Sequence, residues 1–321
     1  MKRYILKRIL TGILVIAFSV MFNFAIIRLA PGDPTRRLAG KENPNPATIE
    51  ALQEKYGLNK PIPEQFVIYV KQLLHGDLGY SYVSTSKVSD LIKTRVAPTL
   101  MIALTGSILG LVIGTLLGIF AARKKGSKMD TALCCVSYFF DSTPSFWLGL
   151  MMILLFASVL KLFPTSGMYN LRTAATGFPR FLDLLKHMFL PVTTLVLIDI
   201  PYYFRIARSS VLQTMSEDFI MTLRATGMSE RKIFNKYVMR NAIIPTVTVF
   251  GITLAYMITG VAMIEIIFAW PGMGRLMLDS ITRRDYPTLS AIYLLLSTSV
   301  AVMMIVVDVV YAWIDPRIRV E

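Results

Sequence analysis

The feature that most constrains this chain is a series of long apolar runs without charged residues. The clearest extends from Ala97 to Ala122 and contains no Asp, Glu, Lys or Arg. A helix of about 20 apolar residues spans the hydrocarbon core of a bilayer. Across the whole chain 54% of the 321 residues are hydrophobic, and the mean hydropathy is +0.56. The sequence therefore predicts an integral membrane protein.

Six apolar runs, not all of them free of carboxylates, predict an all-α membrane protein with six transmembrane helices. The first lies within residues 1–30, follows a basic start and lacks a cleavage site, so we interpret it as an uncleaved span. Residues 31–96 are polar and carry helix start and stop signals, which predicts a small helical domain. The remaining spans lie in a core of residues 97–321, at about 97–122, 131–160, 188–204, 241–269 and 286–308.

The distribution of basic residues predicts the orientation. Seventeen Lys and Arg lie in the N-terminus, the C-terminus and the intervals 123–128 and 205–240, against seven in the loops 161–187 and 268–285. Basic residues are retained on the cytoplasmic side, so both termini are predicted to be cytoplasmic and the 31–96 domain external. The formal net charge of +14 does not indicate nucleic acid, because the basic residues lie between apolar spans and not in aromatic-rich stripes.

A polar interval at residues 216–240 interrupts the core and is predicted to form two short helices. For the first, Ser216 is the expected N-cap, and Glu217 and Asp218 occupy the first turn, where carboxylates favour the helix dipole. Its apolar residues are spaced to share one face: Phe219, Ile220 and Leu223.

Gly227 is predicted to end this first helix in the left-handed conformation, with Ser229 capping the second. The apolar residues of the second helix, Ile233, Phe234, Tyr237 and Val238, mark one side. Two interpretations fit this pattern: an amphipathic connector on the lipid surface, or a helix that docks in a groove of a partner protein.

Three carboxylates fall within the apolar spans: Asp141, Asp199 and Glu265. A carboxylate at the bilayer centre costs roughly 2.5 to 3.5 kcal/mol on insertion scales, so each needs a partner, a proton or contact with water. One interpretation places Asp141 and Asp199 along a polar translocation path. The other is a buried pair or hydrogen bond that fixes helix packing.

The segment after Glu265 carries signals of a turn and a short helix. Trp270 is expected as an interfacial anchor, Pro271 and Gly272 as a turn, and residues 276–281 as a helix. With Gly274, these residues form either a re-entrant outer gate or a plain surface loop.

Several chemistries have no motif in this sequence. It contains no phosphate-binding loop of the G-x-x-x-x-G-K-[ST] type and no metal-ligand cluster, so we expect no cofactor, no metal and no catalytic residue of its own. A membrane enzyme would have to rely on carboxylates alone, around Asp141 and Asp199. A membrane enzyme or scaffold therefore remains only an outside alternative.

Motifs along nearly the whole chain resemble the binding-protein-dependent ABC importer permeases, specifically the B-type subunit of the dipeptide/oligopeptide/nickel transporter family. The most specific match is to that family's EAA loop, at Ala225, Gly227, Arg240-Asn241-Ala242 and Pro245. Further matches are Tyr4 to Arg8, Pro31 to Pro34, Gly76 to Gly79 with Ser81, Pro98 to Leu100, Ser142 to Phe146, Glu265, Phe268, Pro271 to Gly274, Asp285 to Pro287 and Asp315 to Arg317.

The resemblance implies a type I ABC importer permease in a bacterial or archaeal plasma membrane. It implies half of a translocation pathway for di- or oligopeptides, with nickel or another small chelate as the alternative substrate. The implied partners are membrane lipid, a second permease subunit, two cytoplasmic ATPases that bind ATP and Mg, and an external solute-binding protein. The residues implied to contact the ATPase are Glu217, Asp218, Phe219, Leu223, Arg224, Ala225 and Gly227.

The chain departs from the family pattern inside the EAA loop. Leu223 replaces the first Ala, Thr226 replaces a Lys, and Tyr237 stands where His is common. These changes preserve size and helicity, so they affect the individual ATPase contacts more than the docking role.

Overall fold

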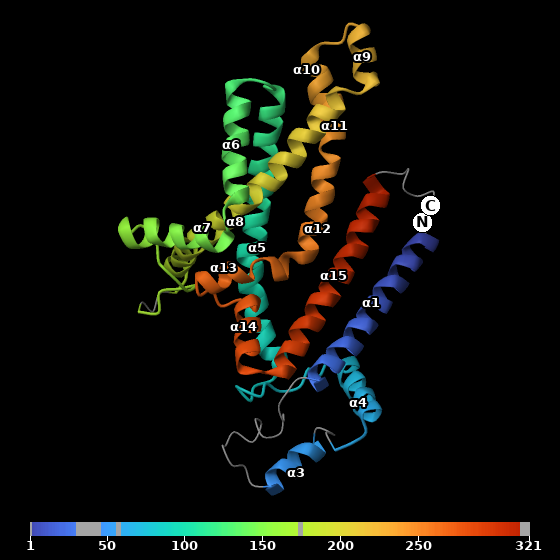
Figure 1. Ribbon diagram of the computed structural model, residues 1–321, viewed down its shortest axis with the longest axis vertical. Helices are drawn as coiled ribbons and strands as arrows, with labels where there is room; N and C mark the ends of the chain where they lie inside the picture. The colour runs from blue at the N-terminus through green and yellow to red at the C-terminus, as the bar shows by residue number, and fades with distance from the viewer. Residues whose placement is uncertain (1, 30–45, 56–58, 173–175, 315–321) are drawn as a thin grey trace. The chain divides into compact units, whose positions relative to one another are not determined.

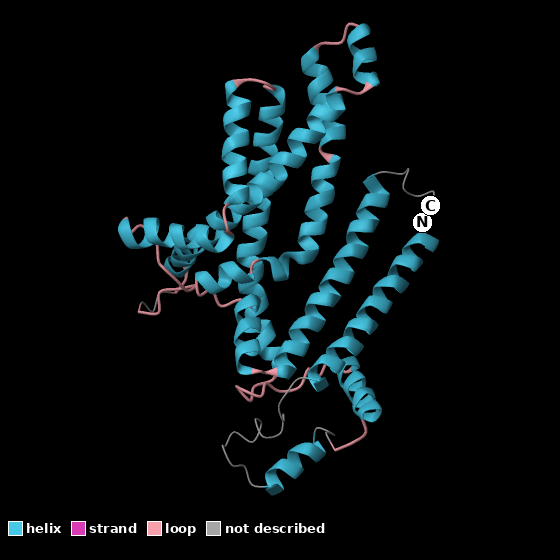
Figure 2. Ribbon diagram, viewed as in Figure 1, coloured by secondary structure: helices cyan, strands magenta, loops and turns pink. Residues whose placement is uncertain are grey.

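A computed structural model describes residues 2–29, 46–55, 59–172 and 176–314 (Figure 1). Within these residues the regular structure is helical, apart from one isolated bridge between Tyr80 and Lys87 (Figure 2). Five described helices are long and apolar enough to cross a membrane, or six if a bent pair counts as one span. The predicted all-α membrane fold is confirmed. The motifs at 31–34 and 315–317 lie outside the described residues.

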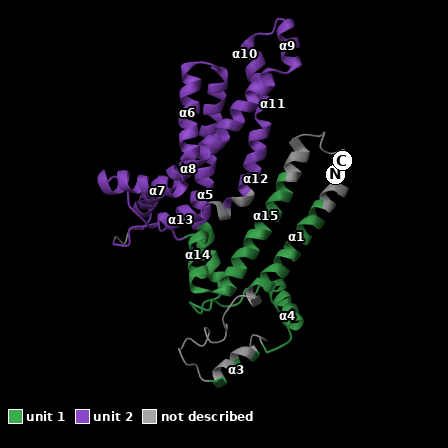
Figure 3. Ribbon diagram, in the orientation of Figure 1, with its two compact units in different colours: residues 1–97, 272–321 green, residues 98–271 purple. Residues whose placement is uncertain are grey.

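The chain divides into two compact units, shown in separate colours in Figure 3. Residues 1–97 and 272–321 form the first unit, and residues 98–271 form the second. Helix α5 (Val88–Arg123) begins in the first unit and continues through the second, with Pro98 inside it.

The first unit brings together the two ends of the sequence. Its other described helices are α1 (Lys2–Leu29), α3 (Pro46–Lys55), α4 (Ile62–Leu74), α14 (Met273–Arg283) and α15 (Tyr286–Ile314). Helices α1 and α15 lie side by side (Figure 1). The Asn23 side chain donates to the Ser290 carbonyl oxygen at 3.3 Å, and a Cβ added to Gly12 would be 2.9 Å from Ile305 Cδ1. The first and last spans therefore pack closely.

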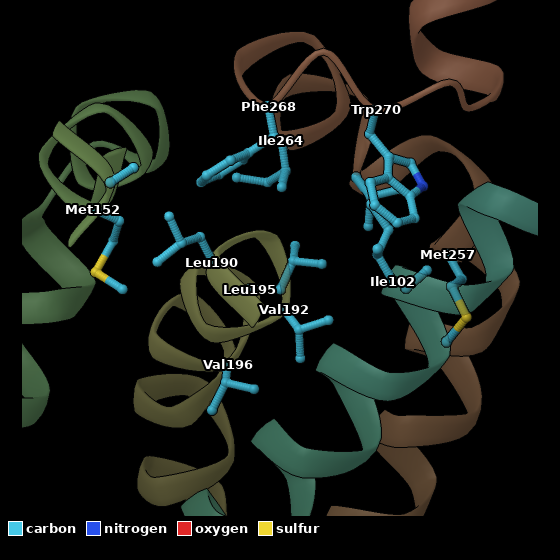
Figure 4. Close-up of a cluster of buried hydrophobic side chains, with 13 residues drawn as sticks. Ile102, Met152, Leu190, Val192, Leu195, Val196, Met257, Ile264, Phe268 and Trp270 are labelled. Carbon is cyan, nitrogen blue, oxygen red and sulfur yellow. The ribbon is translucent and has the colours of Figure 1, made fainter. Parts of the chain in front are cut away.

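The second unit contains the remaining helices and the main apolar core. They are α6 (Lys128–Ser142), α7 (Ser145–Met152), the π-helix η1 (Ile153–Val159), α8 (Phe178–Met215), α9 (Asp218–Ala225), α10 (Glu230–Lys232), the π-helix η2 (Ile233–Val238), α11 (Met239–Ala242), α12 (Ile244–Gly260) and α13 (Ala262–Ile267). Figure 4 shows the core, where Leu190 and Leu195 of α8 meet Ile264 and Trp270. Trp270 is fully buried and donates from Nε1 to the Pro98 carbonyl oxygen at 2.8 Å. It is a core residue, and the expected interfacial anchor was wrong.

A stripe of glycines on α5 allows that helix to approach α8 closely. A Cβ added to Gly110 would be 2.6 Å from Asp199 Cβ, and one added to Gly118 would be 2.5 Å from the Phe204 carbonyl oxygen. Gly106 and Gly114 face α8 in the same way. Glycines spaced four residues apart lie on one helix face, so the stripe serves helix packing.

Three spans differ from the helices predicted by hydropathy. The segment 131–160 bends by 100° between α6 and α7, because Thr143 before Pro144 takes an extended conformation (φ −84°, ψ 124°). The predicted span 188–204 is only the apolar middle of α8, which continues through Pro191 and Pro201, both buried. The predicted span 241–269 divides into α11, α12 and α13.

Candidate functional site

The candidate coupling site is the segment from Glu217 to Ala242, which follows α8 directly. Glu217 is the N-cap of α9, with an extended backbone at φ −72° and ψ 146°. The expected cap, Ser216, instead ends α8, and its hydroxyl donates to the Gln213 carbonyl oxygen at 2.7 Å. Because α8 continues to Met215, Ser216 ends that helix, and the N-cap of α9 is Glu217, one residue later than predicted. The charged residues Glu217, Asp218 and Arg224, together with Ala225, are exposed.

Gly227 forms the turn between α9 and α10. Its φ is +78°, which confirms the predicted left-handed conformation. Its N–H donates to the Arg224 carbonyl oxygen at 2.9 Å, and the next N–H, of Met228, donates to the Leu223 carbonyl oxygen at 3.3 Å. A Cβ added to Gly227 would have no atom within 4 Å. The requirement for glycine here is therefore conformational and not one of space.

The second half of the segment begins at Ser229 and passes through α10, η2 and α11. Ser229 precedes α10 with an extended backbone, as predicted, although its side chain makes no capping hydrogen bond. The π-helix η2 follows, and Asn241 Nδ2 donates to the Tyr237 carbonyl oxygen at 2.9 Å. A π-helix interrupts the regular i→i−4 backbone hydrogen bonds, and this side-chain donor lies at its end.

A compact apolar cluster fastens the coupling segment to α5 and α8. Ile220 of α9 and Ile233 of η2 are each 1% exposed and pack with Val211 of α8 and Ala122 of α5. The Phe234 ring belongs to the same cluster and lies under the Arg123 guanidinium, 4.2 Å from its carbon atom. Burial of these side chains holds α9 against α8.

Helix α9 carries two exposed apolar side chains. Phe219 is 39% exposed and Met221 is 66% exposed, whereas Leu223 packs partly against the apolar cluster. Ile220 and Leu223 lie on the inward face as predicted, and Phe219, four residues before Leu223, lies at the edge of that face. Met221 was missed, although a helix that buries residues 220 and 223 turns residue 221 away from the buried face.

Two of the membrane carboxylates, Asp141 and Asp199, have different partners. Asp141 forms an ion pair with Arg205, and both side chains are substantially exposed. Asp199 accepts from the Ser107 hydroxyl at 3.2 Å. These two residues, predicted as a translocation path, thus contact α8 and α5 respectively and do not contact one another in the described structure.

A fourth carboxylate, Asp130, was not singled out by the sequence. It accepts from Arg208 Nε at 2.8 Å and Nη2 at 2.9 Å, and its side chain is almost completely buried. The Gly126 N–H also donates to Asp130 Oδ2, at 3.0 Å, while the Asp130 N–H donates to the Ser127 hydroxyl. The Ser-x-x-Asp spacing of a capping box was the available signal. This bidentate pair joins the α5–α6 turn to α8.

The residues predicted as an outer gate region fall in both units. In the second unit, Glu265 is fully buried and accepts from the Thr99 hydroxyl at 2.5 Å. Pro271 ends that unit. In the first unit, Gly272 is the N-cap of α14 and Gly274 is buried within it. The predicted short helix at 276–281 is therefore present and longer.

Asp285, at the turn between α14 and α15, forms a further polar center in the first unit. It is buried and accepts from the Ser81 hydroxyl at 2.5 Å, the Tyr82 N–H at 2.9 Å and the Thr288 hydroxyl at 2.8 Å. These contacts hold the loop before α5 against the start of α15. Among the described residues, no group of three or more His, Cys, Asp or Glu is placed to hold a metal ion.

Comparison with known proteins identifies the family to which this chain belongs. Residues 114–320 match the family model described as "Binding-protein-dependent transport system inner membrane component", and residues 1–105 match the N-terminal model of the same membrane component. The chain belongs to this family. It is therefore a multi-pass membrane subunit of a binding-protein-dependent transport system, and the family resemblance predicted from the EAA loop is confirmed.

Curated relatives match the permease over its full length. The oligopeptide transport system permease protein AppB of Bacillus subtilis is 35% identical, over 99% of this chain and 100% of its own. The di/tripeptide transport system permease protein DppB of Pseudomonas aeruginosa is 35% identical over 99% of both chains. The dipeptide permease DppB of Escherichia coli is 32% identical over 99% of both. These relatives are bacterial and the family description names the inner membrane, so nothing here supports the archaeal alternative.

A solved structure supports the type I ABC importer permease fold. A chain from an inward-facing MetNI methionine ABC transporter matches 70% of this permease and 96% of its own length, with a TM-score of 0.56 and 17% identity. A likeness at that identity concerns the fold alone.

Proposed function

We propose that this permease forms half of the translocation pathway of an ATP-driven importer of di- or oligopeptides. The observation that carries the proposal is full-length similarity to three permeases that are named for oligopeptide, di/tripeptide and dipeptide transport. The family description adds that the system depends on a binding protein. The runner-up substrate, nickel or a small chelate, has no comparable support among these relatives.

The energy for transport enters through partner subunits. Two cytoplasmic ATPases bind ATP and Mg, a second permease completes the pathway, and an external solute-binding protein delivers the peptide. The absence of a phosphate-binding loop in the sequence supports this division of labour.

In this proposal α9 is the helix that docks in a cleft of an ATPase subunit. The exposed side chains of Phe219 and Met221, on different sides of α9, supply apolar contacts to that cleft, flanked by the charged residues Glu217, Asp218 and Arg224. Ile220 supplies the inward contact to the apolar cluster of α5, α8 and η2. A displacement of α9 is passed on because its inner side is packed and its connection at Gly227 is a defined turn.

Uptake by intact cells tests the substrate. Deleting the gene is expected to abolish ATP-dependent uptake of a radiolabelled dipeptide or tetrapeptide, and a plasmid copy is expected to restore it. Uptake of ⁶³Ni²⁺ is expected to be unchanged. If the deletion strain takes up peptide normally but no longer takes up nickel, the substrate is nickel and not a peptide. Normal uptake of both would contradict the importer function for these solutes.

A further inference from the structure

A narrow crevice lies where the coupling segment joins α12. Its walls come from α5 at Thr115 and Ile119, from α8 at Ala207 and Val211, and from the joint at Ala242 and Thr246. Val211 and Ala242 also belong to the apolar cluster that fastens α9. The crevice therefore lies directly on the connection between the coupling segment and the span that follows it.

Two of the crevice residues carry hydroxyl groups without a hydrogen-bond partner in the described structure. Thr246 is 1% exposed and Thr115 is 9% exposed, and the Oγ1 atom of each is buried and unpaired. A helical Thr ordinarily donates to the carbonyl oxygen four residues earlier, as Thr194 does to Leu190 at 2.8 Å. Buried polar groups are nearly always hydrogen-bonded, so two exceptions in one crevice require an explanation.

Hydration does not satisfy these hydroxyls in the arrangement described here. The crevice contains no space wide enough for a water molecule, although its polar groups are of the kind that bind one. The arrangement thus bears the desolvation cost of both hydroxyls. Any movement that widens the crevice enough to admit water removes that cost.

The helix beside the crevice has an irregular backbone. The π-helix η2 precedes it, and Ile243 breaks the helix between α11 and α12. Pro245 follows without an N–H group, so the Asn241 carbonyl oxygen has no helical donor from that position. Such interruptions are where helices bend, whereas Val211 and Ala207 belong to the continuous helix α8.

We propose that this crevice is a hydration site that opens when the coupling segment moves, with the hydroxyls of Thr115 and Thr246 binding the entering water. The proposal rests on the coupling role of α9 proposed above. The segment at Ala242 and Thr246 then has a closed and an open arrangement. Water in the open crevice brings their free energies closer together, because the hydrogen bonds gained there offset the packing that is lost. Thr115 and Thr246 are accordingly positioning residues of the transport cycle.

Nearly isosteric substitutions test the hydroxyls. Thr115→Val and Thr246→Val, alone and together, are made in the complete transporter and reconstituted in proteoliposomes. Each is expected to raise the midpoint of heat denaturation by roughly 2 °C or more, because it removes an unpaired polar group from the observed arrangement. The double variant is expected to lower peptide uptake by about three- to tenfold, the range in which side chains along a coupling path act.

Two control variants separate the hydroxyl from its surroundings. Thr246→Ser keeps the hydroxyl and is expected to keep wild-type uptake. Thr194→Val removes a buried hydroxyl that is already bonded, and is expected not to raise the denaturation midpoint. Wild-type uptake in the double variant would overturn the proposal, whatever its stability. A loss of uptake in Thr246→Ser equal to that in Thr246→Val, or equal stabilisation by Thr194→Val, would also overturn it.

Thiol labelling tests the entry of water directly. Thr246→Cys is made in a chain in which Cys134 and Cys135 are replaced by Ser, and a small methanethiosulfonate reagent is applied to the complete transporter. Labelling is expected to be slow at rest and several-fold faster during ATP turnover with the binding protein. Equal rates in both conditions would overturn the hydration site. Failure of wild-type peptide uptake would instead contradict the proposed substrate, because the labelling depends on ATP turnover and not on which solute is carried.

Discussion

The Arg224 guanidinium donates to the Glu230 carboxylate across the Gly227 turn, with Nε 2.7 Å from Oε1 and Nη2 3.3 Å from Oε2. The same contact raises the pKa of Arg224, so its positive charge is retained at any physiological pH. Both side chains are exposed, and water and salt screen such a pair. The ion pair therefore helps to orient the Gly227 turn. Most of the free energy that holds α9 against α8 comes from the burial of Ile220 and Ile233.

Replacing Gly227 is expected to uncouple the transporter. Proline fixes φ near −65°, whereas Gly227 has φ +78° and donates its N–H to Arg224. We expect Gly227→Pro to insert normally and to lower peptide uptake by about tenfold or more while ATP hydrolysis continues. Gly227→Asn is the matched control, because Asn tolerates the left-handed conformation, and it is expected to keep most uptake. Wild-type uptake by the proline variant would show that the turn has no coupling role.

Cross-linking distinguishes the outward from the inward residues of α9. Phe219→Cys and Met221→Cys are expected to form disulfide or short bifunctional cross-links to an ATPase subunit, since both side chains are exposed. Ile220→Cys, on the same turn but buried, is expected to form none. Electrophoresis of the oxidised complex under non-reducing conditions detects the products. Cross-links from position 220 and none from 219 or 221 would refute the docking arrangement.

Close packing of α5 on α8 predicts a graded response to added methyl groups. Gly118→Ala would place Cβ 2.5 Å from the Phe204 carbonyl oxygen, so one of the two helices must shift. Overpacking of this kind costs about 1 to 3 kcal/mol. Gly149→Ala is the control, because its nearest neighbours are side-chain carbons of Ile267 at 3.3 and 3.4 Å. The midpoint of thermal denaturation in detergent should be well below wild type for Gly118→Ala and close to wild type for Gly149→Ala. Equal midpoints for the two variants would contradict the close packing of α5 on α8.

Charge exchange tests the role of Asp141. In the structure Asp141 forms an ion pair with Arg205. If the pair fixes packing, Asp141→Arg alone is expected to lower the amount of folded permease, and adding Arg205→Asp is expected to restore both that amount and peptide uptake. Restored folding without restored uptake would instead assign Asp141 to the translocation path, as the sequence interpretation allowed.

The sequence predicted the class of protein and the two short helical segments joined at Gly227. Uncharged runs predicted the membrane spans, because a bilayer admits few other structures for them. Gly227 could be recognised because few residues adopt positive φ. The bend at Thr143–Pro144 and the extension of α8 to 38 residues were not predicted, since hydropathy detects apolar segments and is insensitive to helix direction and to polar helix ends.

Contacts between residues far apart in the chain could not be predicted from the sequence. The pairs Asp141–Arg205 and Asp130–Arg208, the burial of Trp270 against Pro98, and the shared crevice of Thr115 and Thr246 each join segments far apart in the chain. Composition determined that this protein is a helical membrane protein, and the motifs quoted above carried its resemblance to the permease family, from which the coupling role of residues 216–240 was predicted. Only the tertiary structure decided which face of α9 is buried and which hydroxyls lack partners, because these depend on the surface that another helix presents and not on the spacing of residues within one helix.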